Sequence, residues 1–539
     1  MAQLLPLLLL LLLPTLHALS IPPPPSEAPS FEESLINIAC LDTSDSDDCM
    51  ARIRTECGDR RRGPVAVLHA AVRGTINEAL RAIDTVSGLG AMSDSLREQT
   101  AIGDCGELLG HTVDELSWSL REMARLESGG SVRRQASLRS WLSAALGNQE
   151  TCLEGFHGTD GRIKHYIAGH MAQVSQLVSN LLEMYKRMRS IVPHGRLPPG
   201  ASDQLPPVTN DTLPSWIAEE DEGLLHADLR AAHVDAVVAT DGTGRYRTIN
   251  EAVNNAPSHS ARRYVIFVKK GVYKENVELK KKKTNIMIIG EGIGETVITG
   301  SRNYMQGWTT FRTATFAVSG QGFIARDITF RNTAGPQNHQ AVALRVDSDR
   351  SAFFRCSFEG YQDTLYAHSL RQFYRECNIY GTIDFIFGNG QAVFQNCKIF
   401  TRRPLPYQKV TITAQGRKDP NQNTGFSIHN CFVYATYPTY LGRPWKAYSR
   451  TVFMQTYMSA QVQPQGWLEW FGDFGLDTLF YGEYRNYGPG AGLGGRVRWS
   501  GYHGIRDAAV ASFFSVRRFI DGSSWLPSTG VPFTADLLK

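Results

Sequence analysis

The sequence predicts two folds in one chain, an all-α four-helix bundle followed by an all-β parallel β-helix. Three observations lead to this prediction. Residues 30–190 carry apolar residues at helical spacing, and residues 231–539 alternate short β-branched and aromatic runs with Gly, Asn and Asp turns. A cysteine-centred motif also recurs in the second part at nearly constant intervals. A chain of 539 residues is long enough to bury a core in each part.

Four amphipathic segments account for most of the N-terminal part. Each has apolar residues three or four positions apart, the spacing of one helix face. The segments are LHAAVRGTINEALRAIDTV, CGELLGHTVDELSWSLREMARL, LRSWLSAALGNQETCLEGF and YIAGHMAQVSQLVSNLLEMYKRM. Short breaks separate them, so we expect an antiparallel bundle over residues 30–190. A disulfide between Cys40 and Cys49 would staple an acidic turn, and one between Cys105 and Cys152 would tie two helices together.

The second part contains an internal repeat. FFRCSF, FYRECNI, VFQNCKI and FSIHNCFV align on Cys356, Cys377, Cys397 and Cys431, at intervals of 21, 20 and 34 residues. Near-equal steps followed by a longer one predict stacked β-helix coils, one of them enlarged by a loop. An antiparallel sandwich needs no ladder of constant period. The remaining alternative is a chance alignment of buried cysteines.

The chain begins with an apolar run, Leu4 to Leu13, that is too short to span a membrane. The small residues Ala18 and Ser20 follow it and suit a signal-peptide cleavage site. Residues 1–20 are therefore interpreted as a cleaved secretory signal peptide. No later stretch is apolar for long enough to cross a bilayer. Residues 191–230 are rich in proline and polar residues and are interpreted as a linker or processing region that carries a glycosylation sequon at Asn210.

Nine cysteines suit a secreted protein, but none lies in a CxxC pair and no histidine cluster has ligand spacing. We therefore expect no metal and no other cofactor. The segment GEGIGE lacks the spacing of a phosphate loop and has no following helix, so nucleotide binding is not expected, and no nucleic-acid partner is expected either.

Charge divides the chain into two unlike parts. Up to residue 230 there are 20 Lys and Arg against 30 Asp and Glu, a balance of −10, and from residue 231 there are 36 against 22, a balance of +14. Opposite signs suit two regions that dock on each other, and a basic enzyme suits a polyanionic substrate. The alternative interpretation is two independently solvated surfaces.

Asp363 and Asp384 are the strongest candidates for chemistry. Each lies seven residues after a cysteine of the repeat, so in a β-helix they occupy equivalent positions on adjacent coils, about one strand spacing apart. Two carboxylates that close do not both ionise easily, which yields a proton donor beside an anion. The alternative is structural, because Asp in a turn often caps backbone amides.

A carboxylate pair does not by itself fix the reaction, since retaining glycosidases and an ester hydrolase with an Asp nucleophile both use one. The neighbouring residues discriminate between them. Gln362 and Gln340 offer amide donors for an oxyanion, which acyl chemistry needs. Arg443 could hold one aspartate ionised, and Trp445 offers a flat platform for a sugar ring. No G-x-S-x-G elbow is present, which disfavours a serine hydrolase.

Five ordered segments resemble the signature segments of plant pectin methylesterases. They are GVYKEN (271–276), QAVALR (340–345), GYQDTLY (360–366), GTIDFIFG (381–388) and YLGRPW (440–445), and the resemblance extends through FIDGSSWLPSTGVPF and covers essentially all of residues 231–539. It implies a right-handed parallel β-helix that demethylates homogalacturonan, releasing methanol and leaving galacturonate.

The resemblance also implies roles for individual residues. Asp384 would be the nucleophile, Asp363 the acid and then the base, and Gln362 a stabiliser of the transition state together with Gln340. The residues implied to contact substrate are Thr310, Gln340, Arg443 and Trp445, and those implied to line the cleft are Tyr366 and Phe387. The family pairing implies a disulfide between Cys377 and Cys397, with Cys356 and Cys431 as buried free thiols.

Residues 30–190, with their four cysteines and LGNQETCLEGF, resemble the pectinesterase-inhibitor pro-region of the longer family members. Those members usually carry a basic cleavage motif after PSW, whereas Glu222 and Gly223 replace the basic pair here, which puts processing at that place in doubt. The segment between Cys431 and TYLGRPW is also short for the family.

These features together predict a secreted, monomeric pectin methylesterase of the plant cell wall with an inhibitory or targeting pro-region. The implied partners are homogalacturonan, separate inhibitor proteins and a processing protease. One alternative is a pectin lyase or glycosidase on a β-helix, which would need a third carboxylate or a calcium site. The other is a non-catalytic inhibitor or wall-binding protein whose helical domain carries the function.

Overall fold

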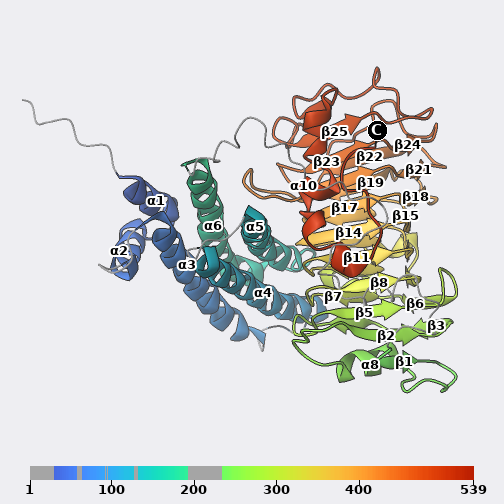
Figure 1. The fold of residues 1–539 in the computed structure, drawn as a ribbon, viewed down its shortest axis with the longest axis horizontal. Helices are drawn as coiled ribbons and strands as arrows, with labels where there is room; N and C mark the ends of the chain where they lie inside the picture. Colours follow the sequence, from blue (N-terminus) through green and yellow to red (C-terminus); the bar gives the residue numbers. More distant parts are fainter. Residues whose placement is uncertain are drawn as a thin grey trace, which may run out of the picture.

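The computed structural model describes residues 30–57, 63–90, 93, 95–126, 132–191 and 234–538. Residues 30–191 form a helical domain and residues 234–538 form a β-helix domain. The two lie side by side, and α4 and α5 are the helices nearest the β-helix (Figure 1). The expected signal peptide, the sequon at Asn210 and residues 192–230 of the expected linker lie outside the described residues.

Four long helices form the predicted bundle. The helices of this domain are α1 (Phe31–Ala39), α2 (Ser46–Cys57), α3 (Pro64–Ser87), α4 (Leu96–Leu126), α5 (Val132–Glu154) and α6 (Arg162–Ile191). Both α3 and α5 pack against α4 and against α6, so the four helices enclose one core. The buried residues of α3 recur at the three- and four-residue spacing of a single face, for example Val72, Ala79, Ala82 and Val86.

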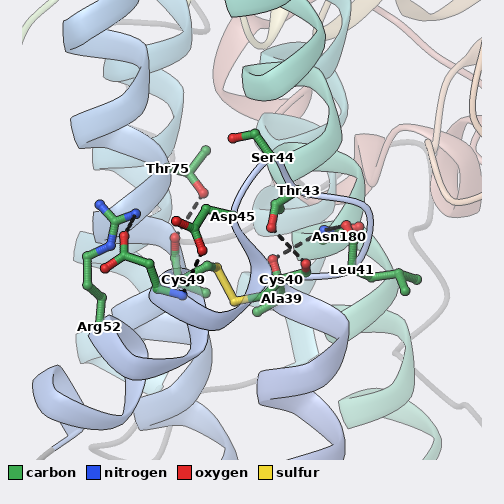
Figure 2. Close-up of a disulfide and its surroundings, with 12 residues drawn as sticks. Ala39, Cys40, Leu41, Thr43, Ser44, Asp45, Cys49, Arg52, Thr75 and Asn180 are labelled. Atoms are coloured by element: carbon green, nitrogen blue, oxygen red, sulfur yellow. Dashed lines mark hydrogen bonds and ion pairs between the residues drawn. A yellow bond between two sulfur atoms is a disulfide. The ribbon is translucent and has the colours of Figure 1, made fainter.

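Two disulfides tie the helical domain together, and both were predicted. Cys40–Cys49 closes the turn between α1 and α2, where the Asn180 side chain of α6 donates to the carbonyl oxygens of Ala39 and Leu41 at 3.2 and 2.8 Å (Figure 2). Cys105–Cys152 joins α4 to α5, 47 residues apart in sequence. The second bridge fixes the two helices that face the β-helix relative to each other.

The coils of the β-helix stack their strands into three parallel sheets. The eleven-stranded sheet contains β1 (Ala236–Val238), β2 (Tyr264–Val268), β5 (Ile286–Ile289), β8 (Ile324–Arg326), β11 (Ser351–Phe354), β14 (Arg371–Arg375), β17 (Gln391–Gln395), β20 (Gly425–His429), β23 (Arg450–Met454), β25 (Phe480–Tyr484) and β26 (Tyr502–Gly504). The eight-stranded sheet contains β3 (Gly271–Lys274), β6 (Thr296–Gly300), β9 (Thr329–Asn332), β12 (Ser357–Glu359), β15 (Asn378–Gly381), β18 (Lys398–Thr401), β21 (Phe432–Tyr434) and β24 (Tyr457–Met458). The seven-stranded sheet contains β4 (Val277–Leu279), β7 (Phe316–Val318), β10 (Leu344–Val346), β13 (Leu365–Ala367), β16 (Ile386–Gly388), β19 (Val410–Gln415) and β22 (Thr439–Pro444).

The cysteine repeat marks the corner between the eleven- and eight-stranded sheets. The residues that follow the four cysteines, Ser357, Asn378, Lys398 and Phe432, are paired in register along the eight-stranded sheet. The residue before each cysteine has a positive φ of 48° to 57°, which turns the chain at the same place in every coil. The longer interval of 34 residues was predicted to hold one enlarged loop, and the structure has a loop on each side of β19.

The disulfide expected between Cys377 and Cys397 is wrong, because both are free thiols in the structure, as are Cys356 and Cys431. Each of the four sulfur atoms lies 3.4–3.6 Å from the carbonyl oxygen two residues before it. Side chains stacked in register on parallel strands point in the same direction, whereas a disulfide needs Cβ vectors that converge. The four stacked cysteines of the repeat are therefore buried in the core as free thiols, and no two of them form a disulfide.

Three short helices lie outside the coils, α8 (Ile249–Asn255), α9 (Ala508–Ser512) and α10 (Val516–Phe519). Thr248 and Glu251 form a capping box at the start of α8, with the Thr248 hydroxyl accepting from the Glu251 N–H at 3.2 Å. Among the described helices, none combines the length and apolar character needed to cross a membrane.

Candidate active site

Asp363 and Asp384 occupy equivalent positions on adjacent coils of the seven-stranded sheet. Leu365 pairs with Ile386 in parallel register, and each aspartate lies two residues before its member of that pair. Both aspartates have a positive φ, 63° and 50°, which Asp tolerates better than most residues and which is common in active-site turns. The aspartates are 8% and 5% exposed, so two carboxyl groups are buried about one strand spacing apart.

Arg443 and Thr411 hold the Asp384 carboxylate from the next two strands. The Arg443 guanidinium donates to both carboxylate oxygens, at 2.9 Å from Nε and 2.6 Å from Nη2. The Thr411 hydroxyl donates to Oδ1 at 2.7 Å and accepts from the Asp384 backbone N–H at 2.9 Å. This fork of donors fixes the orientation of the carboxylate and stabilises its negative charge.

Asp363 is in a different electrostatic environment. Burial, together with the neighbouring Asp384 carboxylate, raises the pKa of Asp363 well above its usual range, and Arg443 opposes the shift only in part. Asp363 therefore keeps its proton to a higher pH than an ordinary aspartate does. The pair contains one proton donor and one anion, the arrangement that acid catalysis beside a nucleophile requires.

Gln362 and Gln340 lie at the same end of the seven-stranded sheet. The backbone N–H of Ala341 donates to the Gln362 carbonyl at 3.2 Å, which places Gln340 one coil before Gln362, and Gln362 directly precedes Asp363. Both glutamines are partly buried. Their position on successive coils beside the aspartates suits a pair of amide donors for a developing oxyanion.

Aromatic rings form one wall of the cleft. Tyr366 and Phe387 stack with ring centroids 4.1 Å apart, and the Trp445 ring lies 5.9 Å from Phe387. A Cβ on Gly416 would lie only 2.8 Å from Cε3 of Trp445, so glycine at this position lets the indole approach the backbone. The predicted cleft residues Tyr366 and Phe387 thus lie together with Trp445, which was predicted to contact substrate.

Thr310 lies at the start of the 3-10 helix Thr310–Thr313, just before β7, and is partly buried. The neighbouring Thr309 hydroxyl donates to Asp104 of α4 at 2.5 Å. The structure therefore places Thr310 on the seven-stranded side of the β-helix, at the surface that α4 covers.

Two residues that support the site were not predicted. Thr411 binds Asp384, as described above, and the Trp470 ring lies 4.2 Å from the Arg443 guanidinium in a cation–π contact. Thr411 could have been found only from the strand register, since it lies in an ordinary β-branched run. Trp470 lies in GWLEWFGDF, an aromatic segment outside the repeat. The aromatic composition of this segment was the only feature of the sequence that could have indicated a role near the site.

Helix α5 lies across this cleft. The Trp141 indole N–H donates to the buried Asp349 carboxylate at 3.0 Å, and the Thr151 hydroxyl lies 3.0 Å from Nε2 of His368. Tyr366 and Phe387 belong to the same apolar cluster as the core of the helical domain, and Trp445 packs against this cluster. The surface that carries the two aspartates is therefore covered by the chain's own helix.

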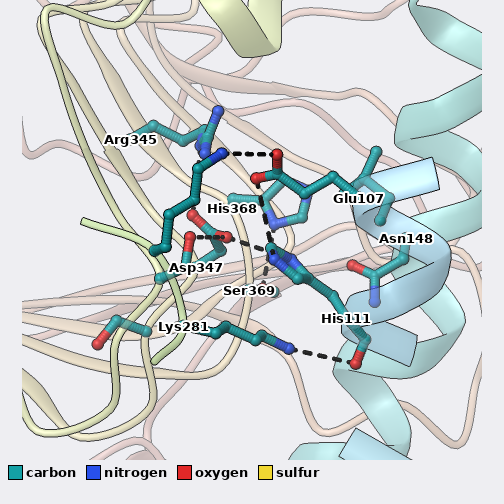
Figure 3. Close-up of polar contacts among 12 residues, drawn as sticks. Glu107, His111, Asn148, Lys281, Arg345, Asp347, His368 and Ser369 are labelled. Atoms are coloured by element: carbon teal, nitrogen blue, oxygen red, sulfur yellow. Dashed lines mark hydrogen bonds and ion pairs between the residues drawn. The ribbon is translucent and has the colours of Figure 1, made fainter. Parts of the chain in front are cut away.

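Helix α4 contacts the same side of the β-helix through buried charges. Arg312 donates to Asp104 at 2.5 Å and to Glu107 at 2.6 Å. Lys281 binds Glu115 at 3.0 Å, and its ammonium also donates to the backbone carbonyl of His111 (Figure 3). Acidic side chains of the helical domain thus pair with basic side chains of the β-helix, which favours docking over two independently solvated surfaces.

Within the described ranges, no group of three or more His, Cys, Asp and Glu side chains has the geometry to hold a metal ion.

Comparisons with known proteins agree with this geometry. Residues 235–523 match the Pectinesterase family, and residues 34–184 match the family described as Plant invertase/pectin methylesterase inhibitor. The chain belongs to the pectinesterase family. Pectinesterases are carboxylic ester hydrolases, and this pectinesterase demethylesterifies pectin.

Similar proteins combine the same two domains. A pectinesterase/pectinesterase inhibitor of Arabidopsis thaliana is 59% identical over 94% of this chain and 93% of its own length, and the pectinesterase/pectinesterase inhibitor PPE8B of Prunus persica is 51% identical over 86% and 88%. The solved structure of pectin methylesterase from carrot matches with a TM-score of 0.56 and 54% identity, covering 57% of this chain and 98% of the carrot chain. The predicted right-handed parallel β-helix is thus confirmed.

Proposed function

We propose that this pectinesterase hydrolyses the methyl ester of homogalacturonan with Asp384 as the nucleophile and Asp363 as the acid and base. The observation that carries this assignment is the bidentate ion pair of Arg443 with Asp384, directly beside the buried Asp363 whose pKa is raised. An oriented anion next to a retained proton matches the two roles that acyl transfer demands.

In the first half-reaction, an oxygen of Asp384 attacks the ester carbonyl carbon. The carbonyl electron pair moves to its oxygen, and the amides of Gln362 and Gln340 donate to the resulting oxyanion. When the oxyanion collapses, the bond to the methoxy oxygen breaks and Asp363 gives that oxygen its proton. Methanol leaves, and the galacturonyl group remains on Asp384 as an acyl-enzyme.

In the second half-reaction, Asp363 accepts a proton from water as the water oxygen attacks the same carbonyl carbon. Collapse of the second oxyanion releases galacturonic acid and restores the Asp384 carboxylate and the protonated Asp363, and the acid then loses its proton to solvent to give galacturonate. Acylation of Asp384 removes the negative charge that helps to raise the pKa of Asp363, so this pKa falls when the proton has to leave. Tyr366, Phe387 and Trp445 would hold the sugar rings, and Arg443 and Thr310 would position the chain.

The test is methanol release from highly methylated pectin by the β-helix domain and its variants. Asp384→Asn should lose at least about 1000-fold in kcat, and Asp363→Asn should lose about 100- to 10000-fold. Asp241→Asn, at an exposed turn of the same domain, is the matched control. Hydroxylamine should divert the acyl-enzyme to a galacturonyl hydroxamate, and no hydroxamate under conditions of full methanol release would exclude the covalent step.

We propose that the helical domain inhibits the site in cis. The support is the position of α5 across the cleft, with Trp141 and Thr151 bound to Asp349 and His368. Methanol release by the full chain should be weak and should rise when the helical domain is removed. Equal activity of the full chain and the β-helix domain would leave the helical domain with a targeting role only.

We also propose that the protein is secreted to the plant cell wall after removal of residues 1–20, that Asn210 carries a glycan, and that processing falls within residues 191–230. Leader cleavage and a glycan are expected of a chain with this N-terminus and this sequon. The N-terminal sequence of the extracellular protein and a mass shift on glycosidase treatment test each point. Homogalacturonan is the expected partner, and separate inhibitor proteins would compete with α5 for the same cleft.

A further inference from the structure

Two lysines stand at the edge of the cleft. Lys418 follows β19 and Lys446 follows Trp445 just after β22, and these two strands are paired in register. Their side chains are 22% and 21% exposed under the cover of α5. Two ammonium groups on neighbouring coils repel each other unless an anion lies between them.

The anion between them is a carboxylate of the helical domain. Glu150 of α5 spans the pair, with one oxygen 2.7 Å from the Lys446 ammonium and the other 3.5 Å from that of Lys418. Glu154, one helical turn further along, binds Lys446 at 2.8 Å. The lysine pair lies close to the reacting carboxyl groups. The Glu154 carboxylate, which binds Lys446, also raises the pKa of Asp363, although burial and the Asp384 charge raise it more.

We propose that Lys418 and Lys446 form a subsite for the carboxylate of an already demethylated galacturonate in the same pectin chain, and that Glu150 occupies this subsite as a carboxylate mimic. The proposal rests on the proposed function, since it assigns a specificity to the same cleft. It makes the two lysines specificity-determining residues and gives α5 a substrate-like contact.

The chemistry of the substrate supports this assignment. Each demethylated residue of homogalacturonan carries a carboxylate, whereas a methylated residue is neutral at that place. Two lysines bind the carboxylate through charge-assisted hydrogen bonds that a methyl ester cannot accept with the same strength. An ester near an existing carboxylate is therefore hydrolysed faster.

The β-helix domain is the appropriate material for the test, because it has its own core, drawn from residues 236–481. The carrot pectin methylesterase, which is matched over 98% of its length, covers only 57% of this chain and was solved as a separate protein. The variant is Lys418→Gln combined with Lys446→Gln. The control is Lys398→Gln, an exposed lysine on β18 of the eight-stranded sheet.

The first measurement is binding of a tetramer of galacturonic acid by calorimetry. We expect the double variant to bind about 10- to 100-fold more weakly than the parent domain, and the control to bind as the parent does. Raising the salt concentration should weaken the parent far more than the double variant. Unchanged binding in the double variant, or no binding of the tetramer to the parent, would overturn the subsite.

The second measurement compares methanol release on fully methylated and on partly demethylated pectin. The double variant should lose the preference for the partly demethylated substrate through a higher KM, with kcat on the fully methylated substrate within about twofold of the parent. An equal loss on both substrates would mean a structural effect and contradict the proposal. If the tetramer binds through the lysines but no methanol is released from either substrate, the proposed function fails while the subsite stands.

Discussion

The Arg443 guanidinium and the Asp384 carboxylate form a bidentate ion pair across two strands of the seven-stranded sheet, with contacts of 2.9 and 2.6 Å. The two residues are 59 positions apart in sequence, and β19 lies between their strands. The ion pair is covered on one side by the ring of Trp470. A planar guanidinium can make both contacts at once, because it donates two parallel hydrogen bonds to the carboxylate while its flat face lies over the indole ring.

Replacing Arg443 by lysine should therefore be severe even though the charge is kept. A lysine ammonium is a point charge and lacks the paired N–H donors of a guanidinium. Asp384 therefore loses its fixed orientation and one of its two hydrogen bonds to residue 443. We expect kcat for methanol release to fall about 100-fold, which corresponds to about 2.7 kcal/mol of transition-state stabilisation. Arg403→Lys, at an exposed position of the β18–β19 loop, is the control and should retain full activity.

The Thr411 hydroxyl should contribute through Asp384 and not by touching substrate. Thr411→Val keeps the shape but removes a donor to a buried carboxylate, for which we expect about a 10-fold loss of kcat with KM little changed. Thr411→Ser should recover most of the activity, because it restores the hydroxyl. A variant in which serine is no better than valine would point to packing as the cause.

The proton on Asp363 should depend on its neighbour. Because burial and the Asp384 charge both raise the pKa of Asp363, Asp384→Asn should lower that pKa while leaving the burial contribution in place. Carbon-13 NMR of labelled aspartate in the parent domain and in the variant measures the shift without any need for activity. In the parent enzyme, activity should fall as pH rises through the raised pKa, since the acid is then lost.

His368 should make the full chain less stable in acid. Burial, followed by the charges of Arg345 and Lys281, lowers the pKa of His368 to about 3, below the value of about 6.5 expected for the unfolded chain. A base whose pKa is lowered by folding binds its proton more tightly when unfolded, so its contribution to stability falls as pH drops from 6.5 towards 3. The slope is about 1.4 kcal/mol per pH unit in this window.

The variant His368→Gln isolates this contribution. The difference in Tm between the parent chain and His368→Gln should shrink steadily between pH 6.5 and pH 4, and stay constant above pH 7. His503→Gln is a comparison at a less buried histidine, and it should show a weaker dependence. A constant difference across the whole range would show that the pKa of His368 is the same in the folded and the unfolded chain.

Docking of α5 should depend on Trp141. Trp141→Ala removes a largely buried ring and the donor to Asp349, at an expected cost of about 3–5 kcal/mol to the docked state. Methanol release by the full chain should rise towards that of the β-helix domain, which lacks α5 and serves as the matched reference. No increase, with docking shown to be lost by limited proteolysis, would mean that α5 does not limit access to the cleft.

Much of the architecture was predictable because it is periodic. The apolar spacing within α3 to α6 identifies helices without reference to any partner, and the interval between Cys356 and Cys377 sets the length of a coil. Once the coil length is known, Asp363 and Asp384 must lie in register, because equivalent positions of stacked coils are neighbours. The carboxylate pair was therefore visible in the sequence before any side-chain contact was known.

The contacts that surround the pair were not predictable in the same way. Thr411, Trp470 and Lys418 reach the cleft from loops and strands whose residue types are ordinary, and their roles depend on which side chains the fold brings together. Charge predicted only that the two parts dock on each other, and not that Glu150 would lie between two lysines. The expected Cys377–Cys397 bridge failed for a related reason, since proximity in register does not supply the converging geometry that a disulfide requires.

The sequence by itself thus determined the two folds, the coil period and the identity of the aspartate pair, because these follow from local spacing and from a repeat. Only the tertiary structure showed that burial and the Asp384 charge raise the pKa of Asp363, that Thr411 binds Asp384, and that α5 covers both aspartates. Those properties arise from burial and from charges that are far apart in the chain, and both exist only after the coils and helices have packed.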